Sequence, residues 1–379
     1  MKAIASFCIV LVLMLSGCNN QLVTLEVANP SDFDRTEELV EIPLVDLEKK
    51  LSLGEQQTYE ITDETGAVLL SQLTYDNKLL FQPRLKANQL KKFQVAISDK
   101  KEDSVSVKVY GRYFPERKDD YAWENECLGF RFYGEALKQV QDPTNGLDIW
   151  LKRTRRMVLE DWYKNDIAHI ASYHVDHGEG CDPYGVGPTL GAGAMAPWVE
   201  GQLIRNENYS SYVELDKGPL RITFELSYPK LDIKGQTIED RRLISLDAGS
   251  YYTRIEQKYS LDQLDVAAGI VKRNGQDSIL VDANKYYLIY QEPVMEPNGQ
   301  VYVGLIFPDK FDTHKVDTYE IGKKKFQHTL AIKKEATPSV IYYTGFGWSK
   351  DKFPTVSSFE AYSKNYIEAL LNPFKITLK

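Results

Sequence analysis

The 379-residue chain has few cysteines, few histidines and no excess of positive charge. Its 46 basic residues are outnumbered by 54 acidic ones, giving a formal net charge of −8 at pH 7. Nucleic-acid-binding proteins need a basic field to attract phosphates, so neither DNA nor RNA is an expected partner. A polyanionic sugar is not excluded, because a local pocket of arginines can bind one against the net charge.

Only four cysteines are present, and none has the CxxC or Cys/His spacing of a structural zinc site. Cys8 and Cys18 lie near the N-terminus, which leaves Cys127 and Cys181 for the folded body. Two alternatives stay open for this second pair. They form a disulfide in an oxidising compartment, or they are separate buried thiols.

Long apolar runs are absent beyond the N-terminus, so no later membrane-spanning segment is expected. The N-terminal run over residues 4–15 is too short to span a bilayer comfortably, and it follows Lys2 and precedes Ser-Gly-Cys18. This order is typical of a lipoprotein signal; an ordinary secretory signal or an uncleaved anchor is the alternative.

The expected consequence is an exported protein. A signal peptide covers residues 1–17, Cys18 accepts the lipid, and residues 18–23 form a tether. The membrane is then a partner through the lipid anchor, and the outer membrane is the expected location, on its periplasmic or surface side.

Tyrosine is abundant, with 24 residues, and short alternating runs of β-branched and aromatic residues recur along the chain. No crossover helices of regular length separate these runs, which favours a large, mainly β, antiparallel sandwich. We expect one domain over residues 24–379, since no linker divides it. The expected strands are 22–27, 38–42, 67–73, 79–83, 93–97, 105–110, 220–226, 251–259, 285–290, 301–307 and 340–343.

Helical patterns are confined to two segments. Residues 135–141 fit a short helix, and residues 357–371 fit a longer one that ends at Asn372-Pro373. In the second, Ser357 and Glu360 fit a capping box.

Three of the five histidines, His169, His174 and His177, fall within nine residues, and a glycine-rich stretch follows to Trp198. Such a segment favours a long structured loop, the usual place for catalytic groups on a rigid scaffold. Imidazole titrates near neutral pH, so histidines beside Tyr173 and Tyr184 offer acid and base partners.

The candidate catalytic residues are therefore His174, His177, Tyr173 and Tyr184. A divalent metal is the competing use of the segment, with His169, His174, His177 and Asp176 as candidate ligands, although no known zinc spacing matches. In an extended run His169, Tyr173 and His177 would share one face. Structural hydrogen bonding is the third alternative.

Arg131 lies in an alternating strand-like segment, where its guanidinium would grip a sugar carboxylate bidentately. Glu124, Arg205, His169 and Trp198 complete the candidate substrate-binding set. For Arg131 and Glu124 the alternative is a cross-strand ion pair. For Tyr113, Trp162 and Trp198, stacking on sugar rings competes with core packing, which is favoured. The basic run 152–156 fits a solvated face.

A set of segments spread over most of the chain after the signal carries a resemblance to known proteins: residues 27–30, Arg35, 38–42, 71–73, 123–126, 173–198, 266–270 and 343–348. Together they resemble a family of lipoproteins from Bacteroidetes polysaccharide-utilisation loci that includes an oligosaccharide dehydratase acting on ulvan fragments. The resemblance implies a galactose-mutarotase-like supersandwich, to which the sequence pattern adds the short C-terminal helix.

The resemblance also implies elimination chemistry on a uronic-acid-containing oligosaccharide. A base removes the C5 proton of a terminal uronate, a cation neutralises its carboxylate, and an acid helps the 4-hydroxyl leave as water. His174 or His177 with Tyr173 or Tyr184 would transfer protons, and Arg131 or Arg205 would bind the carboxylate.

Three other functions stay open. A glycoside hydrolase would need two carboxylates, for which Glu124, Glu126, Asp176, Glu179 and Asp182 are candidates. A non-catalytic surface glycan-binding protein would use the aromatic residues as a platform. An epimerase of the mutarotase type would share the fold.

Overall fold

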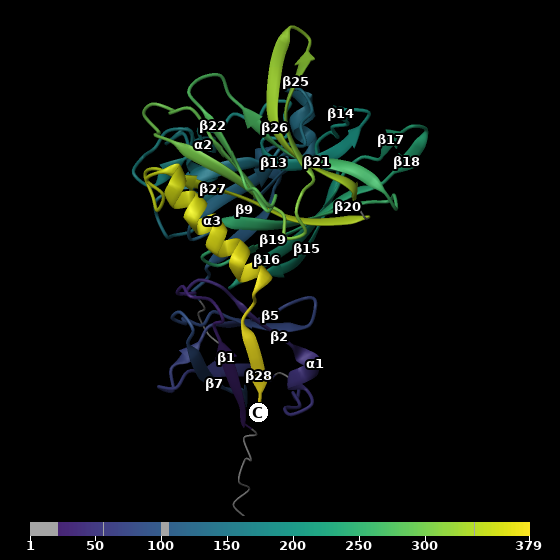
Figure 1. Cartoon of the computed structure of the whole chain (residues 1–379). Helices are drawn as coiled ribbons and strands as arrows, with labels where there is room; N and C mark the ends of the chain where they lie inside the picture. The colour runs from purple at the N-terminus through teal and green to yellow at the C-terminus, as the bar shows by residue number, and fades with distance from the viewer. Residues whose placement is uncertain (1–21, 56, 100–105, 337) are drawn as a thin grey trace, which may run out of the picture.

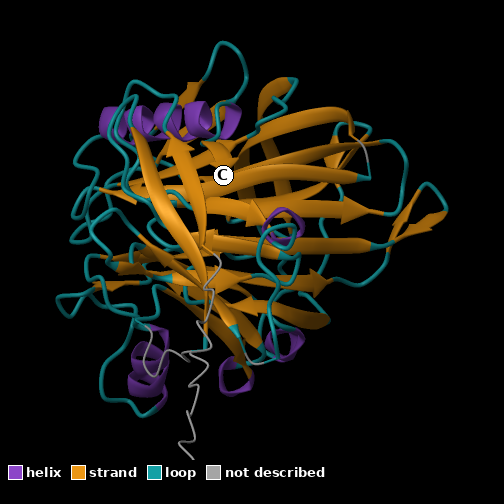
Figure 2. Ribbon diagram, turned by 90° about the horizontal axis from the view of Figure 1, so that it is seen from below, coloured by secondary structure: helices purple, strands orange, loops and turns teal. Residues whose placement is uncertain are grey.

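The computed structural model describes residues 22–55, 57–99, 106–336 and 338–379. The predicted signal peptide, Cys18 and the tether up to residue 21 lie outside the described residues. Within the described ranges, no helix is long and apolar enough to cross a membrane. Strands are the predominant regular structure (Figure 2). The predicted fold class is confirmed: a mainly β, antiparallel supersandwich with a C-terminal helix.

An N-terminal lobe forms the lower part of the molecule in Figure 1. A five-stranded sheet, in the order β28-β1-β7-β3-β4, shares a separate apolar core with a three-stranded sheet, in the order β2-β6-β5. Its elements are β1 (Leu22–Ala28), β2 (Val40–Pro43), α1 (Leu44–Leu47), β3 (Thr58–Thr62), β4 (Val68–Leu69), β5 (Ser71–Leu73), β6 (Lys78–Phe81), β7 (Leu90–Ser98) and β28 (Lys375–Leu378).

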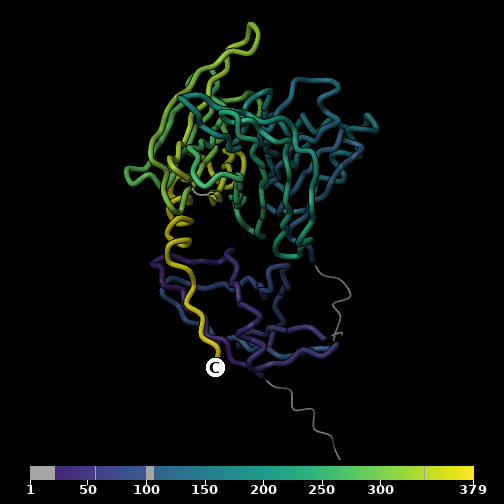
Figure 3. Tube along the Cα trace, turned by 90° about the vertical axis from the view of Figure 1, so that its right-hand side faces the viewer, coloured from purple at the N-terminus to yellow at the C-terminus, as the bar shows by residue number. Residues whose placement is uncertain are grey.

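The last strand returns to this lobe from the far end of the chain. β28 pairs antiparallel with β1, with Leu25 opposite Leu378. Figure 3 shows the C-terminal segment running down beside the first strands. The two ends of the described chain therefore lie side by side and join the lobes.

The larger sandwich lobe has an eight-stranded sheet, in the order β15-β16-β19-β20-β27-β24-β23-β22. Its strands are β15 (Ser211–Lys217), β16 (Arg221–Ser227), β19 (Asp240–Asp247), β20 (Tyr252–Tyr259), β22 (Ser278–Val281), β23 (Tyr287–Gln291), β24 (Val301–Ile306) and β27 (Ser339–Trp348).

Two five-stranded sheets pack against it. The first, β12-β11-β10-β9-β8, contains β8 (Val109–Phe114), β9 (Asp120–Asn125), β10 (Leu128–Phe132), β11 (Asp148–Lys152) and β12 (Gly180–Cys181). The second contains β13 (Ala192–Val199), β14 (Gln202–Leu203), β21 (Leu264–Lys272), β25 (Thr313–Ile321) and β26 (Lys324–Ala336), and β17 (Leu231–Ile233) pairs with β18 (Gln236–Ile238) outside these sheets.

Strand alternation determines what each sheet face carries. In β16, Ile222, Phe224 and Leu226 point into the core, so Arg221 and Thr223 point to the outer face. From the other layer, the Trp123 ring packs against Phe224 with ring centroids 5.0 Å apart. The apolar core thus fills the space between the sheets, and polar groups collect on both outer faces.

The C-terminal helix α3 (Val356–Leu371) packs on the eight-stranded sheet through Phe359, which is fully buried. The capping box was predicted two residues too late: Thr355 caps the helix and Ser358 completes the box. The helix predicted at 135–141 is a 3₁₀ turn, η2 (Glu135–Gln139), and a second one, η1 (Pro115–Arg117), follows β8. Helix α2 (Leu159–Ile167) was not predicted.

Candidate functional site

The histidine loop, residues 168–191, connects α2 to β13 and contains only the two-residue strand β12. Its end is tied to the start of β11, because Ala192 N donates to the Leu147 carbonyl at 2.8 Å. Gly191 has φ +61°, and a Cβ there would lie 2.1 Å from the Leu147 oxygen, so this turn requires glycine. Leu190 N also donates to Nε2 of the buried His328 at 2.9 Å. The loop is therefore a fixed structure.

Beneath this loop lies the carboxylate cluster, which we define as Arg131 with Asp120, Asp148 and Asp182. Arg131 Nε donates to Asp148 at 2.9 Å, Nη2 donates to Asp182 at 2.8 Å, and Nη1 lies 3.5 Å from Asp120. All four side chains are at least 94% buried. They come from β9, β10, β11 and the loop, and they occupy the outer face of that sheet.

Three carboxylates around one guanidinium leave an excess of buried negative charge. Burial raises the pKa of Asp120 to about 7, and burial together with the neighbouring carboxylates raises the pKa of Asp182 well above its usual value. Oδ1 of Asp120 and Oδ1 of Asp148 have no hydrogen-bond partner in the described part of the chain. The arrangement therefore favours holding a proton near neutral pH, which is typical of functional sites.

Next to the cluster, Tyr184 and Glu292 form a second group of buried polar atoms. The Tyr184 hydroxyl and both Glu292 oxygens lack a hydrogen-bond partner among the described residues. Arg273 Nε approaches Glu292 at 3.6 Å, and its guanidinium lies 5.0 Å from the Tyr184 ring centroid. Burial raises the pKa of Glu292 to about 7 and keeps Tyr184 protonated by raising its pKa.

His174 lies at the outer edge of the cluster. Its Nδ1 is 2.8 Å from the Asp182 carbonyl oxygen and 3.7 Å from the Asp182 carboxylate. A carbonyl can only accept, so Nδ1 carries the hydrogen and the neutral ring keeps its lone pair on Nε2. The side chain is 58% exposed, and Nε2 has no partner among the residues described. His174 therefore has the geometry of a general base open to solvent.

The other candidates in the loop lie differently. Tyr173 is buried, and its hydroxyl accepts from Arg117 and from Arg131 at 3.1 Å, so it is a structural partner of the cluster. His177 is exposed, with Nε2 on the Ser172 carbonyl at 3.1 Å. His169 is exposed at φ +57°. The prediction that His169, Tyr173 and His177 share one face of an extended run is wrong, because the segment turns.

The candidate metal site is not formed. Asp176 pairs with Arg153 at 2.9 Å, and His174 faces Asp182 instead of the other two histidines. Within the described ranges no three His, Cys, Asp or Glu side chains are grouped as metal ligands.

The substrate-binding role predicted for Arg131 and Glu124 is not supported by their surroundings. Arg131 is enclosed by carboxylates, so its guanidinium has no open edge for a sugar carboxylate. Glu124 is fully buried, accepts from Lys152 at 2.5 Å and from Val158 N at 2.7 Å, and so fixes the start of α2. In the basic run 152–156, Lys152 departs from the predicted solvated face because it is buried, whereas Arg153, Arg155 and Arg156 are exposed as predicted.

Trp198 and Arg205 lie apart from the cluster. The Trp198 ring packs on the small apolar group of β21 and β26, with Lys315 Nζ 4.8 Å from its centroid. Arg205 stacks over Tyr319 at 4.0 Å. Of the favoured core aromatics, Trp162 stacks on Trp150, with centroids 5.6 Å apart.

Of the two alternatives for the second cysteine pair, the structure has the separate buried thiols and not the disulfide. Cys127 and Cys181 are both buried free thiols. Cys127 lies against the Gly249 carbonyl, whereas Cys181 approaches Asn298. Burial raises the pKa of each thiol to about 12, so both stay protonated.

Sequence reasoning missed Asp120, Asp148, Glu292 and Arg273. Asp148 had a detectable signal, since it sits inside the apolar run Leu147–Leu151, where a charge needs a buried partner. Glu292 directly follows the buried β23. Arg273 carries no such signal, because it is one of many cations at strand ends.

The chain is similar to several known proteins. An uncharacterized protein P7 of Formosa agariphila is 31% identical over 389 residues, which cover 97% of this chain and 96% of that protein. A glycosyl hydrolase family 38 protein from Enterococcus faecalis has a similar fold, with a TM-score of 0.54, 11% identity and coverage of 95% of this chain. An α-mannosidase from Enterococcus faecalis V583 also has a similar fold, with a TM-score of 0.50, 11% identity and coverage of 95% of this chain.

This chain spans about half of the two solved structures, 47% and 46% of their lengths, so they show the fold alone. The family model described as a domain of unknown function, DUF4861, matches residues 27–376, which is nearly all of the described chain. The protein belongs to the DUF4861 family.

Proposed function

We propose that the protein is a carbohydrate-active lyase that dehydrates the terminal uronate of acidic, ulvan-like oligosaccharides. The observation that carries the proposal is the solvent-facing Nε2 of His174, whose Nδ1 is held by the Asp182 carbonyl, close to buried acids that have oxygens without hydrogen-bond partners. A base at the rim and proton-holding groups beneath it are what an elimination requires. The similarity of the fold to a glycosyl hydrolase family 38 protein and to an α-mannosidase supports a carbohydrate substrate.

The proposed reaction removes one water. His174 Nε2 takes the C5 proton, the electron pair of that bond forms the C4–C5 double bond, and the C4–O bond breaks. The Tyr184 phenol, which its raised pKa keeps protonated, is buried, so it supplies the second hydrogen of the leaving oxygen through an intervening water, and the 4-hydroxyl departs as water. The proton on His174 then returns to Tyr184 through solvent.

Arg273 replaces Arg131 and Arg205 as the proposed partner of the uronate carboxylate. Its side chain is 32% exposed, and its only carboxylate neighbour at ion-pair distance among the described residues is Glu292. When Glu292 is protonated, the positive charge of Arg273 is not neutralised and can bind the substrate anion.

A glycoside hydrolase is the second candidate, favoured by the names of the structural neighbours. Its candidate carboxylates are less suited to this role, because each of four pairs with a cation. The pairs are Glu124 with Lys152, Asp176 with Arg153, Glu179 with Arg156 and Asp182 with Arg131.

One incubation separates these functions. The protein is mixed with uronate-terminated oligosaccharides, with and without EDTA, and enoate absorbance is followed together with product mass. Elimination predicts rising absorbance and the loss of one water. A split mass without absorbance would establish hydrolysis, and binding without turnover would support a glycan-binding protein.

We further propose that the protein is exported and anchored to the outer membrane by lipid on Cys18. The support is the sequence order at the N-terminus. Cells fed labelled palmitate should label the wild-type protein and not Cys18→Ser. Equal labelling of both would contradict the anchor.

A further inference from the structure

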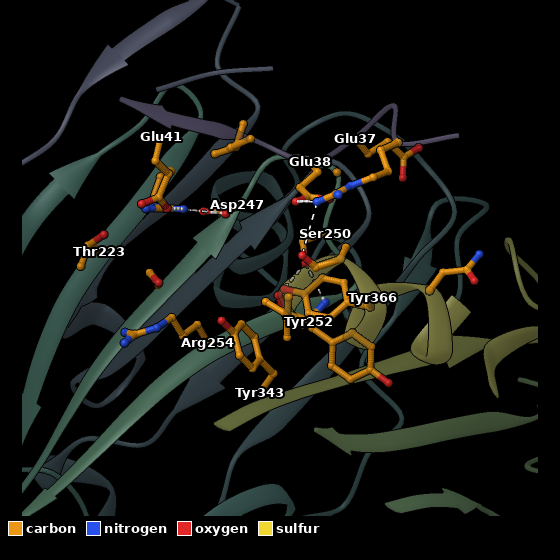
Figure 4. Close-up of a pocket in the computed structure, with 18 of the residues that line it drawn as sticks. Glu37, Glu38, Glu41, Thr223, Asp247, Ser250, Tyr252, Arg254, Tyr343 and Tyr366 are labelled. Carbon is orange, nitrogen blue, oxygen red and sulfur yellow. Dashed lines mark hydrogen bonds and ion pairs between the residues drawn. The ribbon is translucent and has the colours of Figure 1, made fainter. Parts of the chain in front are cut away.

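A cavity of about 540 Å³ lies between the two lobes. Its floor is the outer face of β16, β19, β20 and β27, one side is the N-terminal lobe, and α3 closes another side (Figure 4). None of the carboxylate cluster residues lines it. We call this cavity the interlobe cleft.

The interlobe cleft has many charged side chains, and all of its cations are already paired. Eight carboxylates and five basic side chains line it, and every basic side chain pairs with a carboxylate. Arg221, for example, contacts Glu41 at 2.7 Å and Asp247 at 2.5 Å. The remaining pairs are Arg35 with Glu38, Lys78 with Glu41 and Asp76, Arg254 with Glu256, and Lys352 with Glu37.

An anionic sugar would therefore find no unpaired cation among the described lining residues and would meet excess negative charge. A uronate is disfavoured in this cleft for that reason. An uncharged ligand has no such penalty.

Two buried polar side chains in the cleft have atoms without a well-aligned hydrogen-bond partner. Thr223 is 3% exposed and Asp216 is 6% exposed. Neither the Thr223 hydroxyl nor Oδ2 of Asp216 makes a well-aligned hydrogen bond among the residues described, although these two neighbouring side chains interact with each other, whereas Oδ1 of Asp216 accepts from Tyr75 N at 2.8 Å. Unsatisfied buried groups cost free energy unless a ligand or water meets them. Both atoms suit ligand hydroxyls, which can donate and accept.

Aromatic rings lie beside these polar atoms. Tyr343 from β27 and Tyr366 from α3 are half-buried, with ring centroids 5.5 Å apart and ring planes 73° apart. Figure 4 shows Tyr343 next to Arg254 on the floor, with Glu41 across the cleft. Apolar ring faces with a few placed polar groups are the usual composition of a small-molecule site.

We propose that the interlobe cleft is a second saccharide site, which binds an uncharged oligosaccharide segment through Tyr343, Thr223 and Asp216. The site lies on the opposite outer face of the sandwich from His174, and it does not depend on the proposed elimination. It gives the protein a means to hold a neutral part of a glycan.

Isothermal titration with cellotetraose, xylotetraose and mannotetraose tests the proposal, with tetragalacturonate as the anionic comparison. At least one neutral tetrasaccharide should bind the wild-type protein, and Tyr343→Ala and Thr223→Val should each weaken it roughly tenfold. Thr223→Val keeps the side-chain shape and removes only the hydroxyl. Tyr212→Ala is the control, since Tyr212 lies on β15 of the same sheet but does not line the cleft.

Circular dichroism of each variant separates loss of binding from loss of folding. The proposal is overturned if no neutral tetrasaccharide binds, or if both cleft variants bind like the wild type. It is also overturned if tetragalacturonate binds more tightly than the neutral sugars and Tyr343→Ala abolishes that binding. Because turnover is measured separately on uronate substrates, this result and that of the proposed function are independent.

Discussion

The two outer faces of the sandwich differ in how deeply their charged side chains are buried and in how accessible they are to a ligand. On the sheet of β8–β12, α2 and the histidine loop cover one arginine and three carboxylates that one positive charge cannot neutralise. On the eight-stranded sheet, the N-terminal lobe leaves an open cleft in which each cation has a carboxylate partner. The face of β8–β12 has carboxyl groups that hold protons near neutral pH. The face of the eight-stranded sheet has polar atoms suited to binding hydroxyl groups.

The comparison shows why a large cavity alone does not locate chemistry. The interlobe cleft is spacious, but all of its cations are paired with carboxylates. Few of its buried polar atoms lack a hydrogen-bond partner. The cluster face has carboxyl groups with raised pKa values and a free imidazole nitrogen. Perturbed acids beside an open base are the stronger sign of catalysis.

The largest expected effect on stability comes from removing the central cation. Arg131→Met should lower the free energy of unfolding by about 3–5 kcal/mol, because it leaves three buried carboxyl groups without the cation that they surround. Arg254→Met, in the cleft, should change it by about 1 kcal/mol or less, since that pair is partly exposed. Urea denaturation of both variants measures the difference. Equal losses would contradict the distinction between the faces.

A pH-dependent effect should follow from Glu292. Its pKa rises from 4.5 in the unfolded chain to about 7 in the folded one, so the folded state binds more protons between these pH values. Stability from this group is therefore fully present below about pH 4.5 and is lost as the pH rises through about 7. Across this pH range, Glu292 changes the free energy of unfolding by about 3 kcal/mol in total.

Glu292→Gln removes this titration. At pH 8 the variant should have a higher melting temperature than the wild type, and at pH 5 the two should be close. Thermal denaturation across this range makes the comparison. A wild-type melting temperature that rises relative to the variant from pH 5 to pH 8 would show that Glu292 is ionised and stabilising.

The smallest effect concerns the cysteines. A reductant should leave the melting temperature unchanged, and both thiols should react with a thiol reagent only after unfolding, because they are buried and unpaired. A fall of several degrees on reduction would indicate a disulfide and contradict the described geometry.

Local patterns in the sequence predicted much of the fold. Alternation located β1, β16, β20 and β24 within one or two residues of their observed bounds. Helix ends were harder: Thr355, and not Ser357, caps α3, since two neighbouring residues offered similar hydroxyls. No local sequence pattern predicted that β28 pairs with β1, because the two strands lie at opposite ends of the chain.

The candidate site was predicted in part. Tyr173, His174 and Tyr184 belong to one loop, so the sequence brought them together. The sequence could not show that β10 and β11 pair with Arg131 opposite Asp148, which turns a presumed substrate-binding arginine into a buried structural one. Glu292 and Arg273 reach Tyr184 only through long-range packing, which no local pattern encodes.

The most direct test of the account compares His174→Ala with His177→Ala in the elimination assay on uronate-terminated oligosaccharides. Both histidines lie in the same loop, but only His174 has its Nδ1 fixed by Asp182 and its Nε2 free. The account predicts that His174→Ala keeps the wild-type circular dichroism and loses about 10²–10⁴-fold in rate, while His177→Ala stays near wild type. A folded His174→Ala protein with wild-type turnover would contradict it.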